Sequence, residues 1–547
     1  MLAKLIDGSV RHRYLVLFII AAIAAFGLFQ LRKLPIDAVP DITNNQVQIN
    51  SVAPELSPVN MEKLVTFPVE TSLAGIPGLE TTRSITRNGF SQVVAIFSDD
   101  TDIYFARQQV GERLNQIGDA LPQGVQPTMG PISTGLGEVL MWSIRYAEPG
   151  TKDAKVRDGK PGPQSDGSYI TPEGQRLTTE TARAAYLRTV QDWIVALQMR
   201  TVPGIAGVDS IGGYQKKYLV QPDPAKLSSY GLSFMDVADA LERNNLSVGA
   251  NYVNRGGEAF LARVDARITS IDQIENAVMA ERGGVPIRLS DVANVSIGGE
   301  LRTGAASENG NQAVIGTAPM LLGENSRAVA QDARAQLEQI KPTLPPGVEM
   351  QIVLDRSKLV NATIETIQKN LTEGALLVIV SLFLLLGNFR AAIISALVIP
   401  CSFLMMAIGM NWLKVPGNLM SLGALDFGLI VDGTVIIVEN FLRRMAERQE
   451  HEGRLLNVGE RLEEVAGSVK EMIRPSLFGQ AIILMVFAPL LTFTGVEGKT
   501  FSPMAITVML ALVAAFILSM TLVPARWEMP RMAVCGMTLR TGVPFVR

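Results

Sequence analysis

The stretch Gly423-Ala-Leu-Asp426-Phe-Gly-Leu-Ile-Val-Asp432-Gly-Thr-Val-Ile-Ile-Val-Glu439-Asn440 decides the fold of this chain. It lies in a hydrophobic block, residues 419–441, which is long enough to cross a bilayer as a helix of about 20 residues. An acidic side chain near the centre of such a helix costs roughly 2.5–3.5 kcal/mol on insertion scales, so these acids are usually functional. We therefore predict a membrane-spanning helix that carries an ion- or proton-coupling site.

The spacing of Asp426, Asp432 and Glu439 divides them between two faces of that helix. Glu439 follows Asp432 by seven residues, which is about 20° short of two full turns, so these two acids share a face. Asp426 precedes Asp432 by six residues and is expected roughly 120° around the helix. Gly428 and Gly433 remove side-chain bulk beside the acids, so a neighbouring helix can approach closely. The pattern favours transport coupling over the alternative, an acid that only pairs with a basic residue of another span.

Five further hydrophobic blocks have the length and composition of membrane spans: residues 14–31, 371–387, 391–413, 477–493 and 501–523. Lys4, Arg11 and Arg13 precede the first block, and many basic residues follow the fourth span: Arg443, Arg444, Arg448, Arg454, Arg461, Lys470 and Arg474. Because basic segments next to spans stay in the cytoplasm, we expect a cytoplasmic N-terminus. Residues 34–370 then lie on the outer side of the membrane.

The composition excludes several other classes of protein. Hydrophobic residues make up 48% of the chain and charged residues 18%, and the net charge is −3. No basic stripe is present, so no nucleic-acid partner is expected. Two cysteines (Cys401, Cys535) and two histidines (His12, His451) are too few for a Cys/His metal cage or a disulfide framework. We expect no bound cofactor, and any metal would be bound mainly through oxygen ligands.

An intramembrane aspartyl protease is the enzyme alternative. That chemistry needs two carboxyl groups that face each other and share a proton. Asp426 and Asp432 diverge on one helix, and no other span offers a well-placed aspartate. We therefore reject this class.

Residues 34–370 have an ordinary soluble composition. Strand patterns cover residues 47–52, 92–97, 218–220 and 259–264, and helical patterns cover residues 58–74, 104–117, 234–244 and 271–280. This mixture predicts small α+β subdomains of the split βαβ kind. An apolar stripe from Tyr186 through Trp193 to Leu197 is expected to pack in a core. Residues 148–176 are rich in Gly, Pro, Lys and Asp and are expected to form an exposed hairpin or loop.

Several motifs resemble the heavy-metal efflux branch of the resistance–nodulation–division (RND) superfamily. The pattern Asp426-Phe-Gly-x-x-x-Asp432-Gly-x-Val-x-x-x-Glu439-Asn440 is similar to the fourth-helix signature of that branch. The other segments that carry the resemblance are residues 34–41 (LPIDAVPD), 66–70 (TFPVE), 75–79 (GIPGL), 87–91 (RNGFS), 210–213 (SIGG) and 309–310 (NG). The resemblance covers residues 1 to about 525, and its motifs are specific.

The resemblance implies a homotrimeric pump in the inner membrane of a Gram-negative bacterium, driven by proton influx. Such a pump works with a periplasmic adaptor protein and an outer-membrane channel to expel metal ions. Asp426, Asp432 and Glu439 would belong to its proton-coupling set, with Asp432 essential. The Asp-Phe-Gly form resembles the divalent-cation branch, so cobalt, zinc, cadmium or nickel would be the transported substrate. Glu138 is the candidate extracytoplasmic metal ligand, although an ordinary acid at a strand end fits it as well.

The expected fold is therefore an α-helical membrane bundle of six transmembrane helices with a large α+β periplasmic insertion, as in one half of an RND-type transporter. The expected regions are residues 1–33 with the first helix, 34–370 with the periplasmic pore and docking subdomains, 371–441 with helices two to four, 442–475 as a cytoplasmic amphipathic segment, 476–525 with helices five and six, and 526–547 as an aberrant tail.

The sequence departs from the family pattern at its C-terminal end. A complete pump of the family has two homologous halves and twelve spans, whereas this chain shows six spans and loses the pattern after Ala525. Residues 526–547 have neither helical periodicity nor strand alternation and resemble translation in a wrong frame. We therefore expect that the chain alone does not pump. An auxiliary or export component of the superfamily and a non-functional truncated product remain as alternatives.

Overall fold

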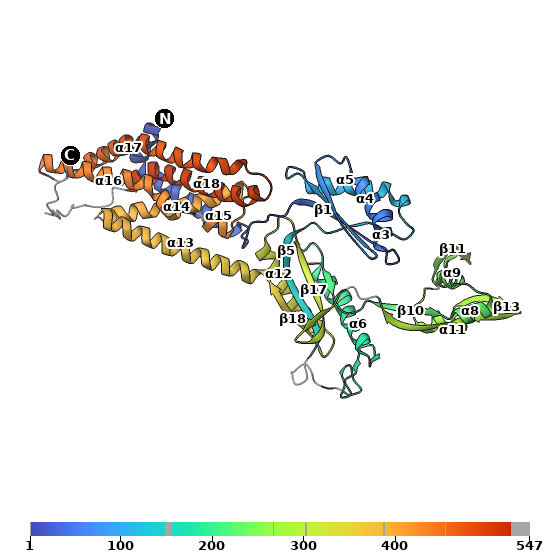
Figure 1. Cartoon of the computed structure of the whole chain (residues 1–547). Helices are drawn as coiled ribbons and strands as arrows, with labels where there is room; N and C mark the ends of the chain where they lie inside the picture. The colour runs from blue at the N-terminus through green and yellow to red at the C-terminus, as the bar shows by residue number, and fades with distance from the viewer. Residues whose placement is uncertain are drawn as a thin grey trace. The chain divides into compact units, whose positions relative to one another are not determined.

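The computed structural model describes residues 2–147, 156, 158–265, 267–300, 304–386, 389–423, 425–454 and 456–526. The chain forms two compact units (Figure 1). Unit 1 comprises Met1–Val139, Pro319–Gln331 and Asp355–Arg547, and unit 2 comprises Leu140–Ala318 and Asp332–Leu354. Apart from Arg526, the sequence tail 526–547, with Cys535, lies outside the described residues.

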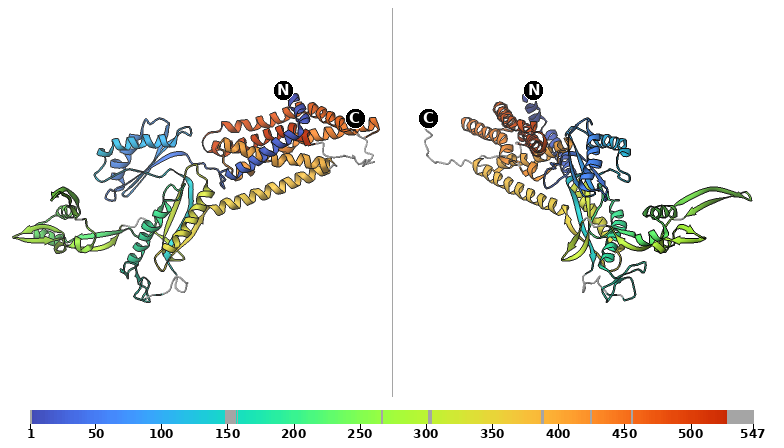
Figure 2. Two further views of the ribbon diagram at one scale, coloured as in Figure 1. Left: turned by 180° about the vertical axis from the view of Figure 1, so that it is seen from behind. Right: turned by 45° about the vertical axis from the view of Figure 1, so that its right-hand side comes forward.

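Six helical segments among the described residues are long and apolar enough to cross a membrane, which confirms the predicted number of candidate spans. The helices are α2 (Arg13–Lys33), α13 (Arg356–Leu386), α14 (Phe389–Trp412), α16 (Phe427–Glu452), α17 (Val458–Phe487) and α18 (Gly495–Arg526). The short helix α15 (Leu419–Gly423) precedes α16 in the fourth span. Both views in Figure 2 show the long helices side by side in one bundle.

Three helices form the centre of this bundle. Most residues of α14, α16 and α18 in their apolar windows are buried, whereas α2, α13 and α17 expose most of theirs. A small residue brings α2 against α14, because a β carbon at Gly27 would lie 2.5 Å from the carbonyl oxygen of Leu404. Close backbone approach at glycine is a common way for membrane helices to gain packing contacts.

The amphipathic helix α1 (Leu2–Arg11) packs against α17 and α18. Ile6 is fully buried, and the Ser9 hydroxyl is also buried and donates to the carbonyl oxygen of Leu5 at 2.8 Å. Lys470 of α17 forms an ion pair with Asp7. These contacts fix the segment that precedes the first span.

The first subdomain after α2 is a four-stranded antiparallel sheet with the strand order β2-β3-β1-β4. Its strands are β1 (Asn45–Val52), β2 (Leu79–Arg87), β3 (Phe90–Phe97) and β4 (Thr128–Met129). The helical elements are α3 (Pro58–Met61), a π turn (Glu62–Thr66), α4 (Phe67–Leu73) and α5 (Ile103–Gln116). The buried side chains of β1, β3, α4 and α5 form one core. The predicted strands 47–52 and 92–97 and the predicted helices 58–74 and 104–117 are therefore confirmed.

The segment 34–41 attaches this subdomain to one end of the helix bundle. Ile36 forms a parallel β-bridge with Gly417, in the loop between α14 and α15. The Asp37 carboxylate accepts from Arg356, the first residue of α13, at 3.0 Å. Lys499 of α18 pairs with Asp99 at 2.7 Å and donates to the carbonyl oxygen of Thr43 at 2.8 Å. Charged groups at the helix ends thus hold the sheet in place within unit 1.

A five-stranded sheet, β16-β17-β5-β18, in which β9 also pairs with β17, has most of its residues in unit 2. The bounds are β5 (Ser133–Tyr146), β9 (Asp209–Ile211), β16 (Ala306–Glu308), β17 (Asn311–Leu321) and β18 (Val348–Asp355). Helix α6 (Glu180–Val190) belongs to unit 2, as does α12 (Ser326–Ile340) from Asp332 onward. The buried Trp142 indole donates to Gln191 at 2.8 Å.

The predicted stripe through Trp193 and Leu197 is wrong in phase. A π turn, Gln191–Val195, separates α6 from α7 (Ala196–Met199). Its wider turn rotates the residues that follow relative to a regular α-helix. Val195 and Met199 are therefore buried, while Trp193 is 71% exposed and Leu197 is also exposed.

Residues 216–300 of unit 2 have a hydrophobic core of their own. This region contains the pairs β10 (Lys216–Pro222) with β15 (Ala293–Gly299), β11 (Ser247–Arg255) with β12 (Glu258–Asp265), and β13 (Val278–Arg282) with β14 (Val285–Arg288). Its helices are α8 (Pro224–Tyr230), α9 (Phe234–Asn244), α10 (Ile271–Glu275) and α11 (Leu289–Val292). The predicted helix 271–280 is wrong in its second half, because Val278–Arg282 pairs as a strand with β14.

The segment predicted as an exposed hairpin or loop contains a small folded sheet. Its strands are β6 (Gly162–Pro163), β7 (Tyr169–Ile170) and β8 (Arg176–Leu177). Tyr169 is buried, and its hydroxyl donates to the carbonyl oxygen of Pro346 at 2.9 Å. Residues 148–155 and 157 of this segment lie outside the described residues.

Candidate functional site

The exposed face of α16 carries two acids. Gly428, Asp432, Ile436, Glu439 and Arg443 recur every three or four residues, and all are exposed. This spacing places them on one stripe of the helix. The opposite side of α16 is buried against the rest of the bundle. The structure thus brings Asp432 and Glu439 to one face, at the spacing expected from the sequence.

Asp426 is not inside the helix, and its predicted position on the same helix as Asp432 is wrong. Helix α15 ends at Gly423, and Asp426 is the N-cap residue of α16, with φ −94° and ψ 112°. Its carboxylate accepts from the backbone N–H of Gly428 at 2.7 Å. Aspartate is a favoured N-cap because its side chain satisfies an N–H that the first turn leaves without a partner. The positive end of the helix dipole also favours a negative charge there.

The N-terminus of α16 borders a cavity of about 290 Å³ between α13 and the α15–α16 segment. Asn370 of α13 and Asp426 supply its polar side chains, and the remaining lining residues are apolar or glycine. Asp426 therefore lies at a small, largely apolar cavity beside the fourth span. Asp432 does not line this cavity.

On the C-terminal side of Glu439, a polar network joins α16 to α17. Asn440 donates to Ser468 at 3.0 Å and to Glu471 at 3.3 Å. Arg444 pairs with Glu464 at 3.0 Å and with Glu471 at 2.8 Å. Arg448 also pairs with Glu464, at 2.6 Å. The sequence contains a signal for this network, because arginines at 443–454 are followed by acidic residues at 460–471. Periodicity alone does not show which of them pair.

Glu138 lies exposed on β5. Among the residues that the structure describes, no three His, Cys, Asp or Glu side chains lie close enough together to hold a metal ion. Glu138 is therefore not part of a group of three such side chains within the described residues. Cys401 is half-buried in α14, and His12 lies between α1 and α2.

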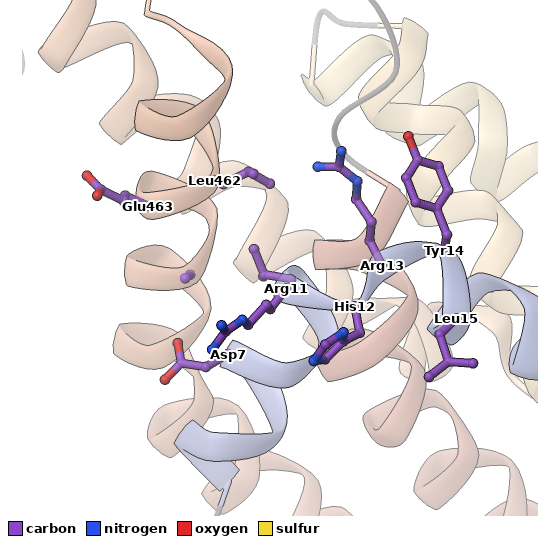
Figure 3. Close-up of a pocket in the computed structure, with 10 residues that line it drawn as sticks. Asp7, Arg11, His12, Arg13, Tyr14, Leu15, Leu462 and Glu463 are labelled. Carbon is purple, nitrogen blue, oxygen red and sulfur yellow. The ribbon is translucent and has the colours of Figure 1, made fainter.

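A second cavity, of about 630 Å³, lies where α1 meets α2 and α17 (Figure 3). Its polar lining includes Arg11, His12 and Arg13, and also the acids Asp7 and Glu463. In Figure 3, the Arg11 side chain points towards Asp7, whereas the Arg13 guanidinium points the other way. The two cations do not converge on one point, so we assign no ligand to this cavity.

Comparison with known proteins agrees with the fold. Residues 5–529 match the AcrB/AcrD/AcrF family. The chain is 61% identical over 525 residues to the nickel-cobalt-cadmium resistance protein NccA of Alcaligenes xylosoxydans xylosoxydans, covering 96% of this chain and 49% of that protein. It is 50% identical to the cobalt-zinc-cadmium resistance protein CzcA of Cupriavidus metallidurans, covering 96% and 47%.

More distant relatives are covered to a similar extent. The cation efflux system protein CusA of Escherichia coli K12 is 33% identical and is covered over 48% of its length. A crystal structure of a heavy metal efflux pump superposes with a TM-score of 0.79 at 31% identity, covering 95% of this chain and 48% of that one. The chain thus spans about half the length of the relatives that it matches. On the match over residues 5–529, the chain belongs to the AcrB/AcrD/AcrF family of RND transporters.

Proposed function

We propose that the chain forms the N-terminal half of a proton-driven transporter that expels divalent heavy-metal cations across the inner membrane. The observation that carries the proposal is the pair Asp432 and Glu439, exposed together on one face of a membrane span. Acidic side chains within a membrane span are costly in lipid and are retained where ions or protons move. Relatives named for nickel, cobalt, zinc and cadmium resistance support a divalent cation as the substrate.

In this proposal the acidic face of α16 is covered by further spans, on a continuation of this chain or on a separate polypeptide. The relatives are about twice as long as the matched region, which supports the second set of spans. Asp432 exchanges the proton, Glu439 extends the acidic face towards the cytoplasm, and Asp426 acts at the outer end of the helix. A homotrimer, a periplasmic adaptor and an outer-membrane channel complete the pump. Unit 2 and the sheet β2-β3-β1-β4 face the periplasm, where Glu138 serves as a metal ligand.

The test is nickel, cobalt and zinc resistance in a metal-sensitive strain that expresses the chain together with a second half from a close relative. Asp432→Asn is expected to abolish resistance, because an amide cannot exchange a proton, while the protein level stays unchanged. Glu450→Gln is the matched control, since Glu450 is an exposed acid near the cytoplasmic end of the same helix. Wild-type resistance in the Asp432→Asn variant would contradict the proposal.

The chain on its own is expected to give no metal resistance, because no further spans then cover the acidic face of α16. Proton-dependent resistance from the 547 residues alone would show that no second half is required. An auxiliary or export role is distinguished in the same strain: the two-half protein would then leave metal accumulation unchanged.

A further inference from the structure

Two buried polar side-chain atoms of α17, at its contact with α16, have no hydrogen-bond partner among the described residues. Ser476 and Gln480 lie one turn apart on α17 and are 4% and 6% exposed. The Ser476 Oγ and the Gln480 Oε1 are both buried and unpaired. A buried polar atom without a partner is unfavourable, and within a bilayer no bulk water can compensate for it. Both atoms therefore point to a small polar ligand.

The two side chains converge on Gly433 of α16. A β carbon at Gly433 would lie 3.0 Å from the Ser476 Oγ and 3.3 Å from the Gln480 Nε2. Any residue other than glycine would press against these polar groups. We call the space between Gly433, Ser476 and Gln480 the Gly433 site.

We propose that water is bound in the Gly433 site and that this water is the inner end of a hydrated path along the α16–α17 seam to the cytoplasm. A bound water needs two to four polar partners. The serine hydroxyl can donate or accept, and the glutamine amide supplies both an acceptor and donors. The site contains no ionised side chain that would select a cation.

Polar groups continue along the seam towards the cytoplasm. Pro475 has no N–H, so the carbonyl of Glu471, four residues earlier, loses its helical hydrogen bond. The Glu471 carboxylate accepts from Asn440 and Arg444. Ser476 is five residues from Glu471, a rise of about 7.5 Å along the helix, which a few water molecules can span.

The path reaches the helix turn that carries Asp432. Asp432 directly precedes Gly433, and its side chain leaves α16 roughly 100° around from the seam. Water at Gly433 would therefore lie behind the acid, on the side facing α17 rather than on the exposed face. This inference rests on the proposed function, because a water path matters for transport only if Asp432 exchanges protons.

Radiolytic labelling tests for the water without any transport assay. The full chain in lipid nanodiscs is exposed to an X-ray pulse, which converts bound water to hydroxyl radicals, and oxidised residues are identified by mass spectrometry. Ile437 and Ile473 lie about one turn from the site on α16 and α17 and are buried, so they are expected to be oxidised. Val398 of α14, equally buried among apolar residues, is expected to stay unlabelled.

Gly433→Ala is expected to lower labelling of both isoleucines about tenfold, because its methyl group takes the space of the water. The matched control is Gly479→Ala on α17, where a β carbon would meet nothing within 4 Å. If Gly433→Ala does not insert, Gln480→Leu removes the acceptor instead. No labelling in the wild type, or equal labelling in the wild type and the variant, overturns the bound water.

Infrared spectra of the chain in supported bilayers test the link to Asp432. In a Glu439→Gln background, which removes the other acid of this face, acidification is expected to produce a carboxyl band that Asp432→Asn abolishes. The band is expected to rise more slowly in Gly433→Ala than in Gly479→Ala. No Asp432 band in the parent protein contradicts the proposed function, whereas a band that rises equally fast in both variants contradicts only the path.

Discussion

The Asp426 carboxylate caps the first turn of α16. This contact makes it possible to distinguish a capping role of Asp426 from a role in proton exchange. Asp426→Ala is expected to destabilise the chain by about 1 kcal/mol, because the Gly428 N–H loses its acceptor. Asp426→Asn keeps an equally good cap and should leave stability unchanged. Unfolding in detergent, followed by circular dichroism, measures both. If Asp426→Asn also preserves metal resistance, the residue is a cap and not part of the proton exchange.

Asp166, in the small sheet β6-β7-β8, gives a pH dependence that is independent of the membrane. Hydrogen bonds from Ser168 and then from Arg176 lower the pKa of Asp166 from 3.8 to about 2. Since the folded-state pKa is depressed, the carboxylate stabilises this sheet above pH 4, and the effect is lost as the pH falls towards 2. Proteolysis of residues 158–177 should therefore accelerate over that range. Asp166→Asn should be cut at the same rate throughout, and a wild type with no pH response would contradict the assignment.

At the scale of elements, the contact between α2 and α14 depends on a single glycine. A β carbon on Gly27 would overlap the Leu404 carbonyl, so Gly27→Ala must push the two helices apart. Overpacking of this kind costs about 1–3 kcal/mol. Gly8→Ala is the control, because a β carbon there meets nothing within 4 Å. The midpoint temperature of unfolding should fall for Gly27→Ala alone, and equal values for both variants would show that the contact is not tight.

The sequence predicted the spans well because their length and apolar composition suffice. It also placed Asp432 and Glu439 on one face, since a regular helix keeps its phase over seven residues. It failed wherever the helix is not regular. The break before Asp426 depends on a capping hydrogen bond, and the exposure of Trp193 depends on a π turn. Neither changes the hydrophobic pattern enough to be visible in it.

The Gly433 site could not be predicted either, for a different reason. The sequence marks Gly433 as a place of close helix approach, but its partners Ser476 and Gln480 lie more than forty residues later on another span. Only the packing of α16 against α17 brings them together. Polar residues in an apolar block remain ambiguous until the facing helix is known.

At the scale of the whole molecule, the positive-inside pattern predicts that residues 34–370 and the end of α16 lie on opposite sides of the membrane. Tyr104→Cys and Glu450→Cys, both exposed positions, test this in a background without Cys401 and Cys535. A membrane-impermeant maleimide should label position 104 in cells whose outer membrane alone is permeabilised. Position 450 should react only after the inner membrane is opened. The reverse pattern would invert the topology.

The acidic face of α16 also has a consequence for biosynthesis. An acid near the centre of a span costs roughly 2.5–3.5 kcal/mol, so the segment that carries Asp432 and Glu439 partitions poorly into lipid when it leaves the translocon. The first three spans are already made when α16 emerges, yet they cover only its other side. In the proposed pump, the further spans that cover Asp432 and Glu439 therefore complete the insertion of α16, and until those spans are in place the two exposed acids would mark the protein for quality-control proteases.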